Sequence, residues 1–509
     1  MASIKRAIVV GDGYAGLTTA ICLTRIGVKS VALVRRPRER SKRSFDPGVG
    51  IWTNGLRCLQ HLGLLEELEA VGRYVGKSGY RDRHGRWLMR PSRPFAASAA
   101  SAPSLLFVRQ SAVITALERA LPPSIECHGG AFVGARRLQN GDGAGSGRGD
   151  EGCSSGSGNG SSNGCGGSGG SGGSSHAVAV QLSDGGELEA DLLIGADGQR
   201  SAIRASLLSG GGGGAGKESK APDPLVYCGY RVVRGMSPEM VGDESFQTWG
   251  VDSRFATVPL RRGQVWYATV TCPPLPERHG TEIFEVSGGG GSGGGRGGRS
   301  DGGGSAAIAK EQLLRLFADW HDPVSRIVSA TPDGDIEVQN AMAFGSFRTP
   351  PPSSPSPLGE LSHCTTLVGD AAHTLDPILA QGIGVAFEDA FRLCACLLAA
   401  GPGAAADSGG DGSSNGEKAV AQASVAAALR AYERSCLQRV RLLTAVSGAA
   451  QAVGQLSGRR ACDARDALLL TTPKALKSRL FDAAADATLA SHYGDVFSSR
   501  ALEYKPPDI

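Results

Sequence analysis

The sequence predicts an α/β fold, and three segments carry that prediction. Residues 4–10 form a short, mostly apolar strand that leads directly into the turn GDGYAG at 11–16 and then into a helical pattern of apolar residues. Segments 190–204 and 367–377 repeat this order of apolar strand, glycine–aspartate turn and helix. Strands alternating with helices in this way are typical of a sheet with helices packed on its faces.

Composition and charge restrict the function. The chain has 509 residues with 53 basic and 49 acidic side chains, a formal net charge of +4, so we expect no nucleic-acid partner. No apolar run approaches the ~20 residues of a membrane-spanning helix. Because the strand pattern begins by Ile4, we expect no signal peptide and a cytoplasmic protein. The 12 cysteines include no C-x-x-C pair, which favours free thiols. The sequence predicts no particular oligomeric state.

Glycine is distributed unevenly. More than half of the 75 glycines lie in four Gly/Ser-rich tracts, which we expect to be flexible inserts in a folded protein. These tracts are residues 140–175, 210–216, 287–305 and 401–418. The first separates strand-like stretches at 131–139 and 177–182, so it is predicted to be the tip of a hairpin. The third precedes a helix-like run at 311–320, and the fourth separates two helices, of which the second starts near Ala419.

The glycines of the first turn each meet a separate requirement of a dinucleotide site. Gly11 allows a tight turn, Gly13 lets the backbone approach a pyrophosphate, and Gly16 permits close packing of the helix on the strand. The helix N-terminus supplies unpaired N–H groups to the anion. Since strand and helix flank the glycines in the required order, the segment is predicted to bind a dinucleotide.

The acidic residue that usually ends the second strand of such a site is missing. Its position falls on Val34 or Arg35, and neither side chain accepts a hydrogen bond. Arg35 fits a 2′-phosphate, hence NADP; alternatively, Glu39 reaches back, or backbone groups alone hold the ribose. A basic run consists of Arg35, Arg36, Arg38, Arg40, Lys42 and Arg43. It is either a solvated loop or a guide for the phosphates of NADPH.

Aspartates mark the other two turns. Asp197 and Gly198 follow one apolar strand, and Gly369 and Asp370 follow the other. A carboxylate at such a turn can accept hydrogen bonds from polyol hydroxyls, while the N-terminus of the next helix faces anionic groups.

Together these segments resemble the class A flavoprotein monooxygenases, the FAD-dependent aromatic hydroxylase and epoxidase family. GADG-x-x-S-x-x-R at 195–204 and GDAAH at 369–373 are the specific motifs, and the resemblance covers nearly the whole chain outside the tracts. Further matches lie at 50–57, 108–117, 249–267, 318–324 and 432–439.

The resemblance implies a role for each matching residue. The three glycines of the first turn hold the FAD pyrophosphate, and Arg109 contacts the ribityl or phosphate part of the flavin. Asp197 and Gly198 belong to a motif shared between FAD and NAD(P)H contacts. Asp370, preceded by Gly369, bonds to the ribityl chain.

The resemblance also places one segment against the isoalloxazine ring. Pro377, Gln381 and Gly382 lie there in the family. This sequence departs from the family at Ala380, where glycine is usual, and the extra methyl group would stand at a close approach to the ring.

The implied fold is a Rossmann-like FAD-binding domain of the glutathione-reductase type, with an inserted β-sheet substrate domain and C-terminal helices. We expect the FAD-binding domain to comprise 1–72, 106–206 and 360–400. The substrate domain would comprise 73–105 and 220–359, and the C-terminal helical segment 419–509.

The implied activity is a monooxygenase reaction. FAD takes a hydride from NADPH or NADH, and one atom of O₂ is transferred to a small aromatic or hydrophobic compound. This chemistry needs no nucleophile triad or metal, and we expect no metal site. Two alternatives remain at this stage. One is a flavin reductase or dehydrogenase of the same fold; the other is a non-catalytic FAD-binding scaffold, which Val34, Arg35 and Ala380 favour.

Several polar and aromatic residues near the motifs allow two interpretations. His373 is more typical of a structural hydrogen-bond partner than of a catalytic group. Asp376 is either a polar group in the substrate pocket or a residue that caps a turn. The aromatic residues that either line a pocket or pack the core of a sheet are Trp249, Phe255, Trp266 and Tyr267.

Overall fold

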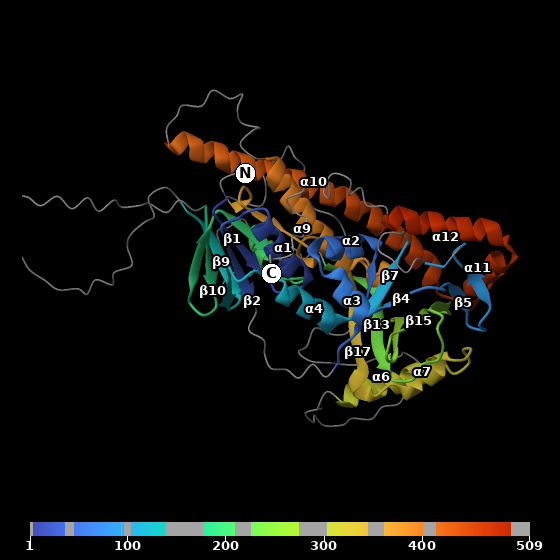
Figure 1. Ribbon diagram of the computed structural model, residues 1–509. Helices are drawn as coiled ribbons and strands as arrows, with labels where there is room; N and C mark the ends of the chain where they lie inside the picture. Colours follow the sequence, from blue (N-terminus) through green and yellow to red (C-terminus); the bar gives the residue numbers. More distant parts are fainter. Residues whose placement is uncertain are drawn as a thin grey trace, which may run out of the picture.

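Two sheets lie at opposite ends of the molecule, and a long helix runs along both (Figure 1). The computed structural model describes residues 4–35, 45–92, 94–95, 103–138, 177–208, 225–273, 303–344, 361–400 and 414–489. The mixed α/β fold that the sequence predicts is confirmed.

The first sheet contains five parallel strands in the order β18-β12-β1-β2-β8. Their bounds are β1 Arg6–Val10, β2 Ser30–Arg35, β8 Ile125–Gly129, β12 Leu192–Gly195 and β18 Thr365–Leu367. Strand β1 is apolar on both sides because both faces of the sheet are covered: Ile8 and Val9 point to opposite faces and have no exposed surface.

Helices cover one face of this sheet and a second, smaller sheet covers the other. Val9 packs in a core with α1 (Tyr14–Arg25) and α9 (Gly382–Ala399). Ile8 packs against α5 (Ala202–Leu208) and an antiparallel sheet of order β11-β10-β9. The strands of that sheet are β9 Phe132–Arg137, β10 Val178–Leu182 and β11 Glu187–Ala190. Since β9 and β10 pair antiparallel, the hairpin predicted around the first tract is confirmed.

A second group of short elements joins the two ends of the molecule. Strands β3, β7 and β4 form a small sheet, and helices α2, α3 and α4 pack beside α1 and α9. The bounds are β3 Gly48–Trp52, α2 Thr53–Leu62, α3 Leu65–Val71, β4 Arg73–Tyr74, β7 Leu105–Arg109 and α4 Gln110–Arg119.

The second large sheet has seven strands in the order β17-β13-β16-β15-β14-β5-β6. The strands are β5 Tyr80–Asp82, β6 Trp87–Met89, β13 Leu225–Ser237, β14 Phe246–Trp249, β15 Ser253–Pro259, β16 Gln264–Thr271 and β17 Ile336–Phe344. Helices α6 (Gly303–Leu316) and α7 (Val324–Ala330) cover one face, where Phe255 and Trp266 are fully buried. For these two aromatic residues the core-packing interpretation is correct.

The C-terminal helices tie the two ends together. Helix α10 (Ser414–Gly454) packs on α9 near the first sheet, and its last turn reaches the second sheet, where Gln451 hydrogen-bonds to the Cys228 carbonyl at 2.7 Å. Helices α11 (Arg459–Thr471) and α12 (Lys474–Leu489) follow it (Figure 1). None of the helices within the described residues combines the length and the apolar character needed to cross a bilayer.

The predicted glycine-rich inserts fall largely outside the described residues. This holds for 140–175 and 210–216 throughout, and for 287–302 and 401–413. The predicted boundaries were too wide at two ends, because 303–305 belong to α6 and 414–418 belong to α10. The helix expected at 311–320 ends at Leu316. The helix expected near Ala419 begins five residues earlier, because small residues inside a helix do not stop it.

Candidate functional site

The three predicted turns lie side by side at one edge of the first sheet. Strands β1, β12 and β18 are adjacent and parallel, and each is followed by one of the turns. The carboxyl ends of parallel strands meet at the same edge, which is where ligands of such sheets bind. Gly13, Asp197 and Asp370 therefore lie along this one edge, the candidate nucleotide cleft.

The glycines of these turns allow contacts that a side chain would prevent. A Cβ atom on Gly11, whose φ is +119°, would lie 2.2 Å from the Ala196 carbonyl oxygen of the second turn. A Cβ on Gly16 would lie 1.8 Å from the Gly11 carbonyl oxygen, and one on Gly369 would lie 2.8 Å from the Cβ of Ala15. Gly13 differs, because a Cβ there would meet only open space. The turns thus pack against one another and leave Gly13 accessible to a ligand.

Asp197 caps a helix with one carboxylate oxygen, and its other carboxylate oxygen has no hydrogen-bond partner among the described residues. Its Oδ2 accepts hydrogen bonds from the backbone N–H groups of Ala202 (2.8 Å) and Ile203 (3.3 Å) at the start of α5. Its Oδ1 is buried and has no hydrogen-bond partner among the described residues. A buried acceptor of this kind needs a partner, and a hydroxyl group of a bound nucleotide would provide one. Gly198, with φ +84°, follows it.

Asp370 opens α8 (Asp370–His373) and lies at the same edge of the sheet. Within the described part of the chain, no side chain or backbone group hydrogen-bonds to that carboxylate, and the residue is open to solvent. The surrounding protein nevertheless desolvates the group, which raises the pKa of Asp370; the nearby Asp389 carboxylate adds to this. A carboxylate in this position is ready to accept hydrogen bonds from a polyol.

His373 is a structural residue, as predicted, and its partner is Asp389 of α9. The His373 ring Nε2 lies 2.6 Å from Asp389 Oδ2, which also accepts the backbone N–H of Gly369 at 2.7 Å. Burial alone would lower the pKa of His373, but the Asp389 carboxylate outweighs it and the pKa is raised. This buried pair fixes the third turn to α9.

The segment from Pro377 to Gly382 joins the third turn to α9. Pro377 begins the short 3-10 helix η3 (Pro377–Leu379), and Gly382 begins α9. The Asn54 side-chain amide lies 3.0 Å from Gln381 Oε1 and fixes that side chain. Ala380 has φ +52°, a left-handed conformation that favours glycine. Its departure from the family pattern therefore carries backbone strain.

Arg109 lies apart from the three turns, whereas Arg35 contacts the first of them. Arg109, at the junction of β7 and α4, hydrogen-bonds to the Asp46 carbonyl at 3.3 Å; no described contact links it to the three turns. Arg35, in place of the missing acid, pairs with Asp12 and Glu118. Glu39 and the basic residues from Arg36 to Arg43 lie outside the described residues.

A polar cluster that sequence reasoning missed lies on the face of the second sheet opposite α6 and α7. Arg254 of β15 is only 2% exposed. Its Nε donates to Gln455 Oε1 (2.7 Å) and to Thr269 Oγ1 (3.0 Å). Its Nη2 is buried and has no partner among the described residues. Burial lowers the pKa of Arg254, although the neighbouring Tyr230 and Asp376 favour its charged form. Such a guanidinium requires an acceptor.

Tyr230 links this cluster to the nucleotide cleft. Its ring lies 5.5 Å from the Arg254 guanidinium, and its hydroxyl donates to Asp376. Asp376 also accepts the Ile378 backbone N–H at 2.9 Å and so caps the turn, which confirms that interpretation. Burial and the Asp376 carboxylate raise the pKa of Tyr230. The signal that the sequence offered for this cluster was Arg254 within an otherwise mostly apolar strand. Such a pattern is too common to identify a site.

The remaining aromatic residues have different roles. Tyr267 is half-buried on the face of the sheet opposite Phe255, and its hydroxyl donates to the Gly48 carbonyl of β3. Trp249 packs on Tyr80, with ring centroids 4.5 Å apart, and lies opposite Arg254 in the neighbouring strand. It also borders a cavity.

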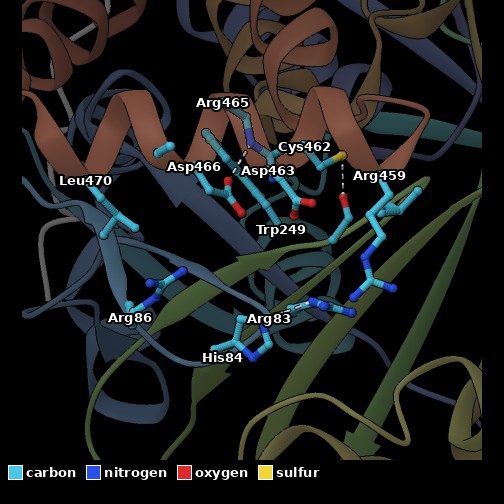
Figure 2. Close-up of a pocket in the computed structure, with 13 residues that line it drawn as sticks. Arg83, His84, Arg86, Trp249, Arg459, Cys462, Asp463, Arg465, Asp466 and Leu470 are labelled. Atoms are coloured by element: carbon cyan, nitrogen blue, oxygen red, sulfur yellow. Dashed lines mark hydrogen bonds and ion pairs between the residues drawn. The ribbon is translucent and has the colours of Figure 1, made fainter.

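That cavity, of about 260 Å³, is bordered by Trp249, the turn between β5 and β6, and α11 (Figure 2). The turn between β5 and β6 contributes Arg83 and Arg86, and α11 contributes Asp463 and Asp466. Asp466 pairs with Arg465 at 2.8 Å. Because both signs of charge line it and none of the predicted turns borders it, we do not assign the nucleotide site to this cavity.

Comparisons with known proteins agree with the geometry. Residues 365–428, which include the third turn, match a family described as FAD binding domain. The chain is 28% identical over 416 residues to 3-amino-4-hydroxybenzoate 2-monooxygenase of Streptomyces cremeus, covering 78% of this chain and 80% of the relative. It is 31% identical to aurachin C monooxygenase/isomerase of Stigmatella aurantiaca, over 43% of this chain and 45% of the relative.

Solved structures share the fold over nearly the full length. The structure of Klebsiella pneumoniae HpxO complexed with FAD and uric acid superposes with a TM-score of 0.64 at 20% identity, covering 97% of this chain and 99% of that one. A salicylate hydroxylase substrate complex superposes with a TM-score of 0.57 at 17% identity, covering 96% and 98%. In sequence the chain is similar to FAD-dependent class A flavoprotein monooxygenases, and the solved structures show that it shares their fold.

Proposed function

We propose that the protein uses NADPH or NADH and O₂ to hydroxylate or epoxidise a small aromatic or hydrophobic compound. FAD, when bound, supplies the redox chemistry: it takes the hydride and reacts with O₂. One oxygen atom enters the substrate, the other leaves as water, and the nicotinamide is oxidised. The chain itself has to bind the nucleotide, orient the substrate and exclude water.

The residues at the three turns fit FAD. Gly13 offers open backbone at the start of α1, where the N–H groups of the helix suit a pyrophosphate. The unpaired Oδ1 of Asp197 and the carboxylate of Asp370 are acceptors for hydroxyl groups of the bound nucleotide. We assign the ribityl chain to Asp370, the isoalloxazine to the segment beginning at Pro377, and the phosphate or ribityl portion to Arg109.

The flavin-ring segment would be held by groups from α2 and α9. Gln381, bonded to Asn54, and Gly382 would lie against the ring, and Gly198 would follow Asp197 along the cleft. Trp52 donates from its indole nitrogen to the Leu379 carbonyl at 3.0 Å and fixes the same segment.

The observation that carries the proposal is the contact between Tyr230 and Asp376. It joins the turn assigned to the flavin ring to the sheet face that holds Arg254. A substrate between them would meet the ring on one side and a buried guanidinium on the other. Because Arg254 Nη2 lacks an acceptor among the described residues, the substrate would carry an ionised or strongly accepting oxygen.

The names of the relatives are consistent with such a substrate. They include salicylate hydroxylase, 6-hydroxynicotinate 3-monooxygenase and 3-amino-4-hydroxybenzoate 2-monooxygenase, all named for ring compounds that carry acidic oxygens. We therefore propose an aromatic acid or phenol as the substrate class of this chain.

The test is a panel of aromatic acids and phenols, with the neutral ring compounds as matched controls. Purified protein should be yellow, and a productive substrate should stimulate NAD(P)H consumption and give a product that contains one ¹⁸O atom from ¹⁸O₂. Peroxide with no labelled product for any compound would indicate a flavin reductase instead. Protein that stays colourless with added FAD would contradict the proposal altogether.

A further inference from the structure

The end of β2 carries a charge of the wrong sign for an ordinary dinucleotide site. The Gly11 backbone N–H donates to the Val34 carbonyl at 2.9 Å, so the glycine turn lies directly against the end of this strand. An acidic side chain at that point usually accepts the ribose hydroxyls of the nucleotide. Here the position holds Arg35, and a guanidinium has donors only. Taken alone, Arg35 would favour a 2′-phosphate.

The structure shows that Arg35 is not available for that role. Its Nε lies 3.3 Å from Asp12 Oδ2, and its Nη2 donates to Glu118 of α4. The side chains of Arg35, Asp12 and Glu118 are 29%, 20% and 27% exposed, so the group stands at the boundary between protein and solvent. One positive and two negative charges leave a net charge of −1. A dianionic 2′-phosphate would be repelled there, whereas a neutral diol would meet carboxylates.

Asp12 is placed to replace the missing acid. It is the second residue of the glycine turn, and its contact with Arg35 brings its carboxylate to the end of β2. An acidic side chain beside a pyrophosphate would ordinarily oppose binding of the nucleotide. Arg35 offsets that repulsion, and Glu118 fixes Arg35 from the other side. The aspartate in the turn therefore supplies the acid that the strand end lacks, and the arginine at the strand end compensates for the charge of that aspartate.

We propose that Asp12, oriented by the Glu118–Arg35 pair, accepts the hydrogen bonds of the adenosine ribose hydroxyls, and that this group of three charges selects a nucleotide without a 2′-phosphate. The inference rests on the assignment of FAD to this cleft. It also bears on the cosubstrate: Arg35 gives no reason to expect NADPH at this position, and any discrimination between NADPH and NADH has to lie elsewhere.

The test uses apoprotein and competition against FAD, followed by flavin fluorescence, with three competitors: ADP, 2′-deoxy-ADP and 2′-phospho-ADP. Wild type should bind ADP about tenfold or more tightly than either of the others, the difference expected for a hydrogen bond to a charged group. D12A should lose the preference for ADP over 2′-deoxy-ADP. E118Q, which releases one carboxylate from Arg35, should bind 2′-phospho-ADP more tightly than wild type does.

The matched control is E66Q, the same charge change at an exposed position in the first turn of α3. It should leave all three affinities unchanged. Wild type that binds 2′-phospho-ADP as well as ADP would overturn the proposal without reference to any variant. So would D12A that is folded by circular dichroism and keeps the wild-type ratio of ADP to 2′-deoxy-ADP. Failure of wild type to bind FAD would contradict the assignment of the cleft instead.

Discussion

The candidate nucleotide cleft and the proposed substrate face, which is the side of the second sheet that holds Arg254 and Tyr230, are built on different principles. The cleft is made of backbone: Gly11, Gly16 and Gly369 let three turns approach within distances that no side chain allows. The substrate face is made of side chains, and Arg254 and Tyr230 come from strands that are separated in sequence from the turn they face. A site defined by close backbone approach therefore leaves a motif in the sequence, whereas a site defined by side chains on a sheet leaves only the pattern of an ordinary strand.

The largest effect is expected from D370A, which tests the cleft. The Asp370 carboxylate has no hydrogen-bond partner in the described protein, so its removal should cost little folding stability. Loss of a charged acceptor should weaken FAD binding by about 10- to 100-fold. Flavin content after gel filtration and the FAD dissociation constant of the apoprotein measure this.

A matched variant, D370N, keeps one acceptor oxygen and should retain more FAD than D370A. If D370A holds FAD as tightly as wild type, Asp370 does not contact the flavin nucleotide. The difference between the two regions then cannot rest on this residue.

The next effect, from R254M, tests the other region. Methionine keeps much of the buried volume but removes the guanidinium, so affinity for an acidic aromatic ligand should fall by about tenfold or more while the flavin content stays unchanged. Ligand-induced changes in the flavin absorption spectrum report the affinity. R254K, which restores charge without the planar donor pair, should lie between wild type and R254M. Equal affinity in all three proteins would remove Arg254 from the substrate site.

A smaller effect concerns the pair that holds the third turn. The Asp389 carboxylate raises the pKa of His373 above its ordinary value of 6.5, so the protonated form stabilises the fold. That contribution is complete below pH 6.5 and disappears as the pH rises through the raised pKa.

The variant H373N should therefore be less stable than wild type by a margin that shrinks between pH 6 and pH 9. Urea unfolding midpoints across this range measure the margin. A margin that is constant with pH would mean that the imidazole is neutral in the folded protein and that the hydrogen bond alone matters.

The smallest effect is expected from A380G. The left-handed φ of +52° at Ala380 costs about 1–2 kcal/mol for a residue with a Cβ atom, while glycine adds ~0.4–1 kcal/mol of unfolded-state entropy. The substitution should therefore stabilise the protein by roughly 0.5 kcal/mol. Thermal unfolding of the FAD-bound protein detects this. A destabilised A380G would show that the methyl group makes a packing contact that outweighs the strain.

The sequence predicted that the three turns come together, and the adjacent strands β1, β12 and β18 confirm this arrangement. Gly11, Asp197 and Asp370 were recognised because each follows an apolar strand, and adjacency of their strands then brings them to one edge. The same reasoning found the hairpin at β9 and β10. It was less accurate for the ends of α6 and α10, since glycine and serine weaken a helix without forbidding it.

The sequence by itself determined the class of the fold, the cofactor and the glycine positions that the cleft requires, because those features depend on short, local patterns. Only the tertiary structure decided that Arg35 pairs with Asp12 and Glu118, that His373 pairs with Asp389, and that Arg254 lies buried beside Tyr230, which contacts Asp376. Each of these depends on which distant side chain faces a given charge. The energy of a charge depends on its partners and its burial, and neither is encoded in the residues beside it along the chain.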